Sequence, residues 1–212
     1  MTACKILLAD DHDIVLAGLR LVLDQPDFAI VGAVKDGRAL VQAARDLKPD
    51  VIISDVTMPL LNGLDAARQI RLVDPEVKLV FLTMHPDVGY ATEALRLGHC
   101  GYVLKSSVSD ELPIAIQAVL QGTTYVSQTI AERVQRALES KRRETTGTER
   151  LTSRQREVLQ LLAEGRAVKE IAFTLNVSPR TVEFHKYRIM DELGVSTTAE
   201  LVRSAMNLGI LK

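Results

Sequence analysis

The first 122 residues alternate between short apolar runs and longer amphipathic segments, and this alternation is the feature that most constrains the fold. The apolar runs are rich in β-branched residues and too short to prefer helix, whereas the segments between them show a helical period. Strands alternating with helices predict an α/β domain with a doubly wound parallel sheet. The five expected strands are 5–10, 28–34, 51–55, 78–83 and 101–105, and the five expected helices lie near 14–23, 37–47, 64–73, 87–97 and 109–121.

A different regime follows the segment ESKRRETTGTER at 139–150, which is polar, charged and without an apolar period. Such a composition is typical of a linker. Beyond it no strand pattern occurs, and the helical periods are broken by turn residues. The sequence therefore predicts three parts: an α/β domain at 1–122, a connecting helix and linker at 123–150, and a small all-α domain at 151–212.

Composition limits the class of protein that this chain can represent. Of its 212 residues, 47% are apolar, which is enough for a core in each of two domains. No apolar run reaches the roughly 20 residues that cross a bilayer, so we expect a cytoplasmic protein with no membrane contact. Cys4 and Cys100 lack CxxC or Cys/His spacing, which predicts reduced thiols rather than a disulfide or a zinc site.

Charge is distributed unevenly along the chain. Residues 1–138 contain 13 Lys and Arg against 17 Asp and Glu, whereas residues 139–212 contain 13 against 10. A mildly basic rear half permits nucleic-acid binding, but so small an excess is weak evidence without a motif.

Polar side chains stand where four of the expected strands end. Asp10 and Asp11 follow the first strand, Asp55 ends the third, Thr83 the fourth and Lys105 the fifth. Each has a simple structural explanation, because an aspartate or threonine can cap the next helix and a lysine can be solvated. The carboxyl ends of parallel strands meet at one edge of the sheet, however, and functional groups gather there.

Taken together, these five residues predict a site for phosphoryl transfer. Three clustered carboxylates repel one another and need a cation, and a set of oxygen ligands favours Mg²⁺ or Mn²⁺ over softer metals. A carboxylate beside a divalent ion, with an ammonium opposite, suits in-line attack on a phosphoryl group. We therefore interpret Asp55 as the residue that forms an aspartyl phosphate.

Four motifs resemble the receiver domain of two-component response regulators, over about residues 5–122: ADDH at 9–12, DVTMPLLNG at 55–63, LTMH at 82–85 and GYVLK at 101–105. The resemblance implies a flavodoxin-like sheet and an Asp55 that a sensor histidine kinase phosphorylates. It further implies that Asp11, Asp55 and the backbone carbonyl of Thr57 bind Mg²⁺, with Asp10 assisting through water.

The same resemblance assigns three residues to the phosphorylated state. Thr83 and Lys105 would contact the phosphoryl oxygens, and Tyr102 matches a switch aromatic that turns inward as the threonine moves. Tyr102 can also be read as an ordinary half-buried strand tyrosine. Ser106 departs from the family pattern, because many receivers have proline after the lysine, and this leaves the geometry of the following loop open.

The rear half carries a helix-turn-helix pattern. A helix at 168–175 is followed by a turn at 176–178, where Ser178 is the expected cap of the next helix and Pro179 its first residue. The apolar face of that next helix predicts a packing role for His185 rather than a catalytic or metal-binding one. The buried face consists of Val182, His185, Ile189 and Leu193.

The stretches KEIA, SPRTVEFH and DELGV resemble the LuxR-type DNA-binding domain, over 151–211, and the pairing with a receiver resembles the NarL/FixJ subfamily. The resemblance implies that the third helix of this domain enters the major groove of promoter DNA. The bases would be faced by Glu183, Phe184 and Tyr187, and the phosphates would be held by Lys169, Arg180, Thr181, Lys186 and Arg188. Periodicity alone also allows a helical interaction module.

The fourth helix of the rear domain carries an apolar stripe that has two readings. In relatives such a stripe pairs two subunits, and it can equally close the domain's own core. Its members are Leu201, Val202, Ala205 and Met206.

These readings together predict a phosphorylation-controlled transcription regulator rather than an enzyme, with at most slow self-catalysed phosphotransfer and dephosphorylation. Phosphorylation adds negative charge to a site that already holds a cation, and this biases a two-state receiver. We expect Thr83 and Tyr102 to move, the recognition helix to be freed, and a homodimer to read two half-sites. RNA polymerase is a further candidate partner.

Two readings from other classes stay open. A phosphatase of the haloacid dehalogenase type also places an aspartate after a parallel strand, but it needs a second aspartate where this chain has Thr57. A constitutive DNA-binding protein would use the front domain only for dimerisation or for sensing a ligand. A transcription-independent adaptor is less favoured, because the helix-turn-helix keeps its basic flank.

Overall fold

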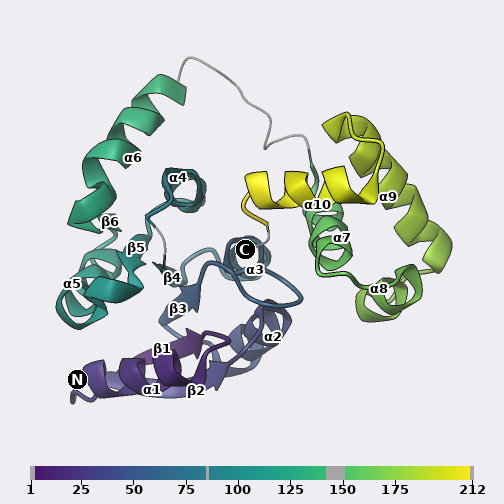
Figure 1. Cartoon of the computed structure of the whole chain (residues 1–212). Coiled ribbons are helices and arrows are strands. Elements are labelled where there is room, and N and C mark those ends of the chain that lie inside the picture. Colours follow the sequence, from purple (N-terminus) through teal and green to yellow (C-terminus); the bar gives the residue numbers. More distant parts are fainter. Residues whose placement is uncertain (1–2, 85, 142–150, 211–212) are drawn as a thin grey trace. The chain divides into compact units, whose positions relative to one another are not determined.

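The structure, a computed structural model, describes residues 3–84, 86–141 and 151–210 (Figure 1). The chain divides into two compact units, Met1–Glu144 and Thr145–Lys212. The first unit ends in helix α6, Gln128–Lys141, so residues 139–141 of the expected linker are helical. The rest of that linker, 142–150, lies outside the described residues.

The first unit is built on a parallel sheet with the strand order β2-β1-β3-β4-β5-β6. The five expected strands are present, and the sequence prediction missed β6 because two residues carry no alternation that could be recognised. The strands are β1 (Cys4–Ala9), β2 (Phe28–Val34), β3 (Val51–Asp55), β4 (Lys78–Thr83), β5 (Gly101–Leu104) and β6 (Tyr125–Val126).

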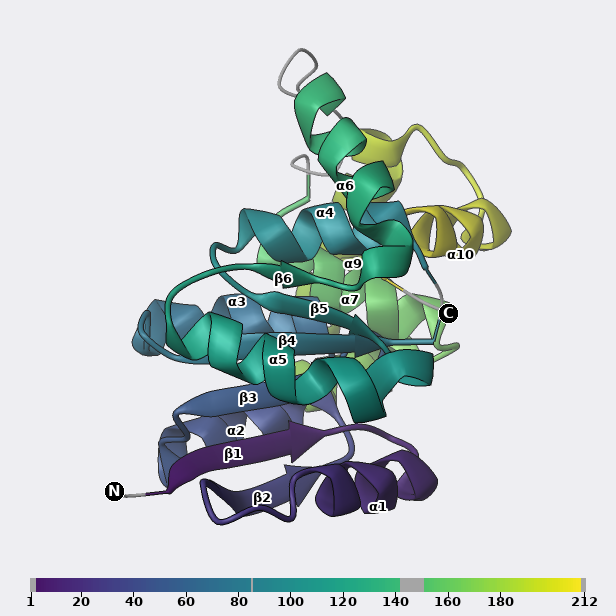
Figure 2. The same ribbon diagram turned by 90° about the vertical axis from the view of Figure 1, so that its left-hand side faces the viewer.

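Helices cover both faces of this sheet, as expected for a doubly wound fold (Figure 2). One face packs on α1 (Asp13–Val22) and α5 (Val108–Leu120). The other face packs on α2 (Gly37–Leu47), α3 (Gly63–Val73) and α4 (Val88–Arg96), together with the first half of α6. Because both faces are covered, the central strand β3 is buried along its whole length.

The register of the strands brings their last residues to one level. Ala9 of β1 pairs with Ser54 of β3, so the next residues, Asp10 after β1 and Asp55 at the end of β3, lie side by side. Thr83 of β4 pairs with Leu104 of β5, and Lys105 follows directly. The chain places β2 on one side of β1 and β3 on the other, so the strand order reverses between β1 and β3. Doubly wound sheets bind ligands at such a point. The predicted polar residues therefore meet at this point.

The loop after Lys105 is short and regular. Lys105–Ser107 form a single 3-10 turn, η1, which runs directly into α5 at Val108. Ser106 therefore occupies the place of the common proline within a helical turn.

The second unit consists, in its described part, of helices: α7 (Ser153–Ala163), α8 (Val168–Leu175), α9 (Pro179–Leu193) and α10 (Thr198–Asn207). The expected helix-turn-helix is α8 and α9. Asn176 adopts the left-handed conformation that ends α8, and the Ser178 hydroxyl accepts the Thr181 N–H at 3.1 Å to begin α9.

The buried face predicted for α9 is confirmed at its centre. Val182 and Ile189 are fully buried, whereas His185 and Leu193 are half-buried. In the part of the chain that the structure describes, no helix has both the length and the apolarity that crossing a membrane requires.

One glycine fixes the distance between α3 and the end of β3. The Gly63 N–H donates to the Val56 carbonyl at 2.8 Å, and a Cβ at Gly63 would lie 2.0 Å from the carbonyl oxygen of Asp55. A side chain at this position would therefore push α3 away from the strand that carries Asp55.

We predict that Gly63→Ala destabilises the first unit by about 1–3 kcal/mol, because the added methyl group overpacks a rigid backbone contact. The exposed helical Gly18 is the matched control, since nothing lies within 4 Å of a Cβ there. Gly18→Ala is expected to stabilise the protein by about 0.5–1 kcal/mol through helix propensity. Urea unfolding followed by circular dichroism measures both, and equal shifts of the two midpoints would contradict the packing argument.

Candidate functional site

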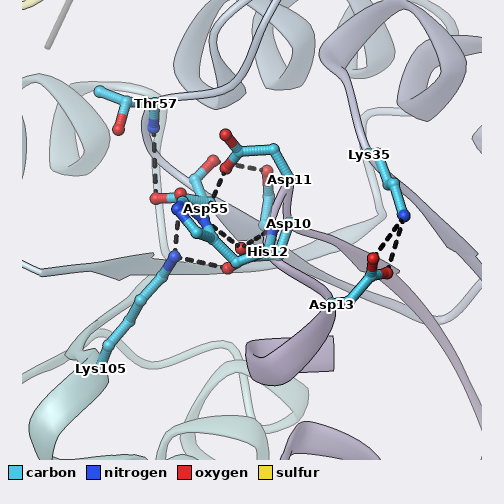
Figure 3. A network of polar contacts seen from close by, with 9 residues as sticks. Asp10, Asp11, His12, Asp13, Lys35, Asp55, Thr57 and Lys105 are labelled. Carbon is cyan, nitrogen blue, oxygen red and sulfur yellow. Dashed lines mark hydrogen bonds and ion pairs between the residues drawn. The ribbon is translucent and has the colours of Figure 1, made fainter. Parts of the chain in front are cut away.

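Lys105 lies between two buried carboxylates at the carboxyl edge of the sheet (Figure 3). Its Nζ is 2.9 Å from Oδ2 of Asp55 and 2.5 Å from Oδ2 of Asp10. The lysine side chain is 5% exposed and both aspartates are buried, so the solvated reading of Lys105 is wrong. β1, β3 and β5 thus each supply one charged group to a single cluster.

The protonation of Lys105 follows from this environment. Burial by itself lowers the pKa of an ammonium group, but the charges of Asp55 and Asp10 and their hydrogen bonds outweigh burial. The pKa of Lys105 is therefore raised, and the residue is a cation at neutral pH.

Asp10 and Asp11 form the acidic side of the cluster together with His12. The backbone N–H of His12 donates to Oδ1 of Asp10 at 2.9 Å, and the ring Nδ1 lies 2.9 Å from Oδ1 of Asp11. Ligand atoms from these three residues and Asp55 all lie within 4.8 Å of one another. The sequence reading did not single out His12, although its place next to two acidic residues was the available signal.

The capping explanation for the first acidic residues is also wrong. The N-cap position of α1 is His12, without a side-chain cap bond, and Asp13 instead pairs with Lys35 at 2.7 Å. Likewise α4 is capped by Asp87, not by Thr83. Asp10, Asp11 and Thr83 are therefore available to the cluster rather than used to begin helices.

Thr57, Thr83 and Tyr102 come from the loop after β3, from β4 and from β5. The N–H of Thr57 donates to Oδ1 of Asp55 at 3.3 Å, at the place where a haloacid dehalogenase phosphatase requires a second carboxylate. Thr83 is buried, and Tyr102 is fully buried rather than half-buried. Burial raises the pKa of Tyr102 strongly, although the adjacent Thr83 side chain favours ionisation. The tyrosine thus faces inward as a neutral phenol.

The outer face of α9 presents two large aromatic side chains to solvent. Phe184 is 57% exposed and Tyr187 is 70% exposed. The guanidinium of Arg188 lies 5.7 Å from the centre of the Phe184 ring, and the His185 ring packs edge-on against Phe184 with the ring centres 5.8 Å apart. These contacts hold Phe184 in place without covering it.

The other predicted DNA contacts lie on α8 and α9. The hydroxyl of Thr181 is hydrogen-bonded to that of Ser178 in the cap of α9, at 2.8 Å. The pKa of His185 is lowered by burial and by the charge of Arg154, which agrees with a neutral packing residue. Lys169, Arg180, Glu183 and Arg188 are exposed, and Thr181 and Lys186 are half-buried.

The apolar stripe of α10 serves two surfaces. Leu201 and Ala205 are fully buried and close the core of the second unit, as one of the two readings expected. Val202 is half-buried and Met206 is 49% exposed. Only these last two present apolar surface beyond the core.

Comparisons with known proteins match both units of the chain to known domain families. Residues 6–117 match the response regulator receiver domain, and residues 149–205 match the bacterial regulatory proteins of the luxR family. The transcriptional regulatory protein MctR of Rhizobium johnstonii is 36% identical, over 98% of this chain and 95% of that protein. The oxygen regulatory protein NreC of Staphylococcus aureus is 37% identical, over 98% of this chain and 99% of its own.

A solved structure has the same architecture. RcsB from Salmonella enterica serovar Typhimurium, bound to promoter P1flhDC in the presence of the phosphomimetic BeF₃⁻, matches with a TM-score of 0.63 and 32% identity. The match covers 95% of this chain and 98% of that one. The chain therefore belongs to the two-component response regulators of the NarL/FixJ type, transcription regulators in which a receiver is joined to a LuxR-type DNA-binding domain. Both matched domains are those of a regulator rather than of a classical enzyme.

We predict that Lys105→Met lowers the stability of the metal-free protein by about 2 kcal/mol or more, because it leaves two buried carboxylates without a cation. Lys35→Met is the matched control, since the Lys35–Asp13 pair is largely exposed and contributes less than about 1 kcal/mol. Urea unfolding in the presence of EDTA gives both values. Similar losses in the two variants would show that the buried cluster does not depend on its lysine.

Proposed function

We propose that Asp55 is the phosphoacceptor of this regulator and that its phosphorylation controls DNA binding by the second unit. The observation that carries the proposal is the position of Asp55 between the Lys105 ammonium and the acidic pair Asp10 and Asp11. A carboxylate that attacks a phosphoryl group needs one positive group to neutralise the negative charge of the phosphoryl oxygens. It needs a second positive group to neutralise the carboxylates beside it. Lys105 supplies the first, and a divalent cation would supply the second.

The acidic pair and Asp55 fit such a cation. Their donor atoms are carboxylate oxygens, which Mg²⁺ prefers and Mn²⁺ accepts, and they lie within 4.8 Å of one another. Asp11, Asp55 and the Thr57 carbonyl would hold the ion, with Asp10 acting through water. When bound, Mg²⁺ supplies positive charge that neutralises phosphoryl oxygens.

The chain's own residues then divide the work of transfer. An oxygen of Asp55 attacks the phosphorus of a phosphohistidine, the new P–O bond forms as the P–N bond breaks, and the imidazole of the sensor histidine kinase leaves. Lys105, a cation whose charge the neighbouring carboxylates stabilise, pairs with the phosphoryl oxygens. The buried hydroxyl of Thr83 donates to another of these oxygens.

The switch passes through the neighbouring strands. Thr83 and Tyr102 come from β4 and β5, which are adjacent in the sheet, and the two side chains lie together in the interior. Movement of Thr83 towards the phosphoryl group changes the space next to Tyr102. This pairing supports a two-state receiver whose equilibrium the phosphoryl group biases.

The second unit reads promoter DNA through α9. Exposed Phe184 and Tyr187, with Glu183, face the bases, and the basic residues of α8 and α9 position the helix on the phosphates. The promoter-bound RcsB structure supports this role by analogy. Val202 and Met206 of α10 contribute to a homodimer that binds two half-sites. RNA polymerase is a further partner at the promoter. The protein acts in the cytoplasm, where it meets both the DNA and the polymerase.

Incubation with Mg²⁺ and acetyl phosphate is expected to add a single phosphoryl group to the wild-type protein. Asp55→Ala is expected to remain unmodified, and Asp13→Ala, which removes a nearby exposed carboxylate, is expected to be modified like the wild type. Intact-protein mass measures all three. Modification of Asp55→Ala at the wild-type level would place the acceptor elsewhere.

Two variants separate phosphate contacts from base contacts. Lys169→Ala is expected to weaken binding to every duplex and to reduce the slope of log K against log salt by about 1. Tyr187→Ala is expected to cost about 1–3 kcal/mol on a selected site and little on random DNA. Arg203→Ala is the matched control, because Arg203 is exposed on α10 and its loss removes the same charge as the loss of Lys169. If Arg203→Ala weakened binding as much as Lys169→Ala, α8 would not form part of the interface.

A further inference from the structure

Ser127, which follows β6, holds the end of β5. Its N–H donates to the carbonyl of Tyr102 at 2.9 Å, and its Oγ accepts the N–H of Leu104 at 3.0 Å. The strand β6 ends at Val126, so the serine hydroxyl replaces the next backbone acceptor of the ladder. Leu104 directly precedes Lys105, and this bond therefore fixes the backbone one residue before the lysine.

Glu111 of α5 determines how this hydroxyl is oriented. The Ser127 hydroxyl is hydrogen-bonded to Oε2 of Glu111. A carboxylate can only accept, so the hydroxyl proton points to Glu111 and an oxygen lone pair is left for Leu104. Tyr125 is bonded to the same carboxylate, and burial, followed by the charge of Glu111, raises its pKa. Glu111 thus bonds to the first residue of β6 and to the residue that follows the strand.

Ser127 also begins α6. Its carbonyl accepts the N–H groups of Ile130 and Ala131 at 3.0 and 3.1 Å. A serine at a helix start ordinarily turns its hydroxyl back to the first helical N–H groups, but here the hydroxyl bonds to Leu104 and Glu111. The carbonyl of Ser127 is therefore held by α6, and its hydroxyl is held by the end of β5 and by Glu111.

The inner face of α6 packs on the same core as the switch tyrosine. Ile130 and Val134 are buried in the cluster that contains Tyr102, Phe81 and residues of α4. A shift of the β5 end thus reaches α6 by two routes, through the fully buried Ser127 and through this packing. In Figure 2, β6 lies beside β5 and leads into α6.

From these contacts we infer that Ser127, oriented by Glu111, is a positioning residue for Lys105 and couples the phosphoryl site to α6. The inference rests on the proposed function, because only a role of Lys105 at the phosphoryl group gives its position a consequence. A purely structural role would satisfy the buried Leu104 N–H but would leave phosphorylation unchanged.

The rate of phosphorylation by acetyl phosphate and Mg²⁺, followed by intact-protein mass, tests the positioning role. Ser127→Ala is expected to lower this rate about tenfold, since displacement of a charged group by a fraction of an ångström weakens its contact in the transition state. Ser127→Thr keeps the hydroxyl and is expected to restore most of the rate. Val119→Ala, a buried cavity variant on the same helix as Glu111, controls for general loss of stability.

Glu111→Ala provides a second, milder variant, because it leaves the serine in place but removes the group that orients it. It is expected to lower the rate by a smaller factor. Hydrogen exchange of the amides of Leu104, Ile130 and Ala131, measured with and without beryllofluoride, tests the coupling. The wild type is expected to change at all three amides. Ser127→Ala is expected to change less at Ile130 and Ala131 than the wild type, because the route through the packing of α6 remains.

Wild-type rates of phosphorylation in both Ser127→Ala and Glu111→Ala would overturn the positioning role. A response to beryllofluoride at the α6 amides of Ser127→Ala as large as in the wild type would overturn the coupling. A rate as low in Val119→Ala as in Ser127→Ala would assign the effect to stability and also reject the inference. Failure of the proposed function has a different signature, because the wild-type protein itself would then take up no phosphoryl group.

Discussion

The ion pairs of Lys105 with Asp55 and Asp10 are the contact on which the proposed function of the first unit depends. They join β1, β3 and β5 at the edge of the sheet, and they place one cation among carboxylates that would otherwise repel one another. A buried ion pair of this kind is weak evidence for stability, because desolvation offsets much of the attraction. Its value here is positional, since it keeps a cation beside the carboxylate that we propose as the nucleophile.

The sheet determines how a change at this site can spread. Asp55 and Thr83 end β3 and β4, and Lys105 follows β5, so under the proposed function a group added to Asp55 would lie next to the other two. Behind them lies Tyr102, and beyond β5 lie β6 and α6. Tyr102, β6 and α6 are joined by packing and by the hydrogen bonds of Ser127, and contacts of this kind between adjacent elements can carry coupling between sites.

Much of this arrangement could be predicted from the sequence, because the signals were local. The five long strands, the capping by Ser178 and the meeting of Asp10, Asp55 and Lys105 follow from apolar periods, cap residues and the rule for parallel strand ends. The second unit was predicted in the same way, down to the turn at Asn176.

Other features depend on contacts between residues distant in sequence, and no local pattern carries them. β6 has two residues, and the bond between Leu104 and Ser127 joins positions 23 apart. The need for glycine at position 63 arises from the Asp55 carbonyl, and the division of the α10 stripe into buried and exposed members arises from packing on α7 and α9. His12 is a different case, because it adjoins the acidic pair in sequence and this local signal was present but was not used.

The central claim is that the state of Asp55 controls DNA binding by α9. The most direct test is the affinity of the full-length protein for a duplex selected from a random-sequence library, measured by fluorescence anisotropy with and without beryllofluoride and Mg²⁺. Wild-type affinity is expected to rise about tenfold with beryllofluoride, which is within the usual range of coupling between sites, and Asp55→Ala is expected to show no response. If Asp55→Ala bound the duplex as tightly as the beryllofluoride-treated wild type, control by Asp55 would be contradicted.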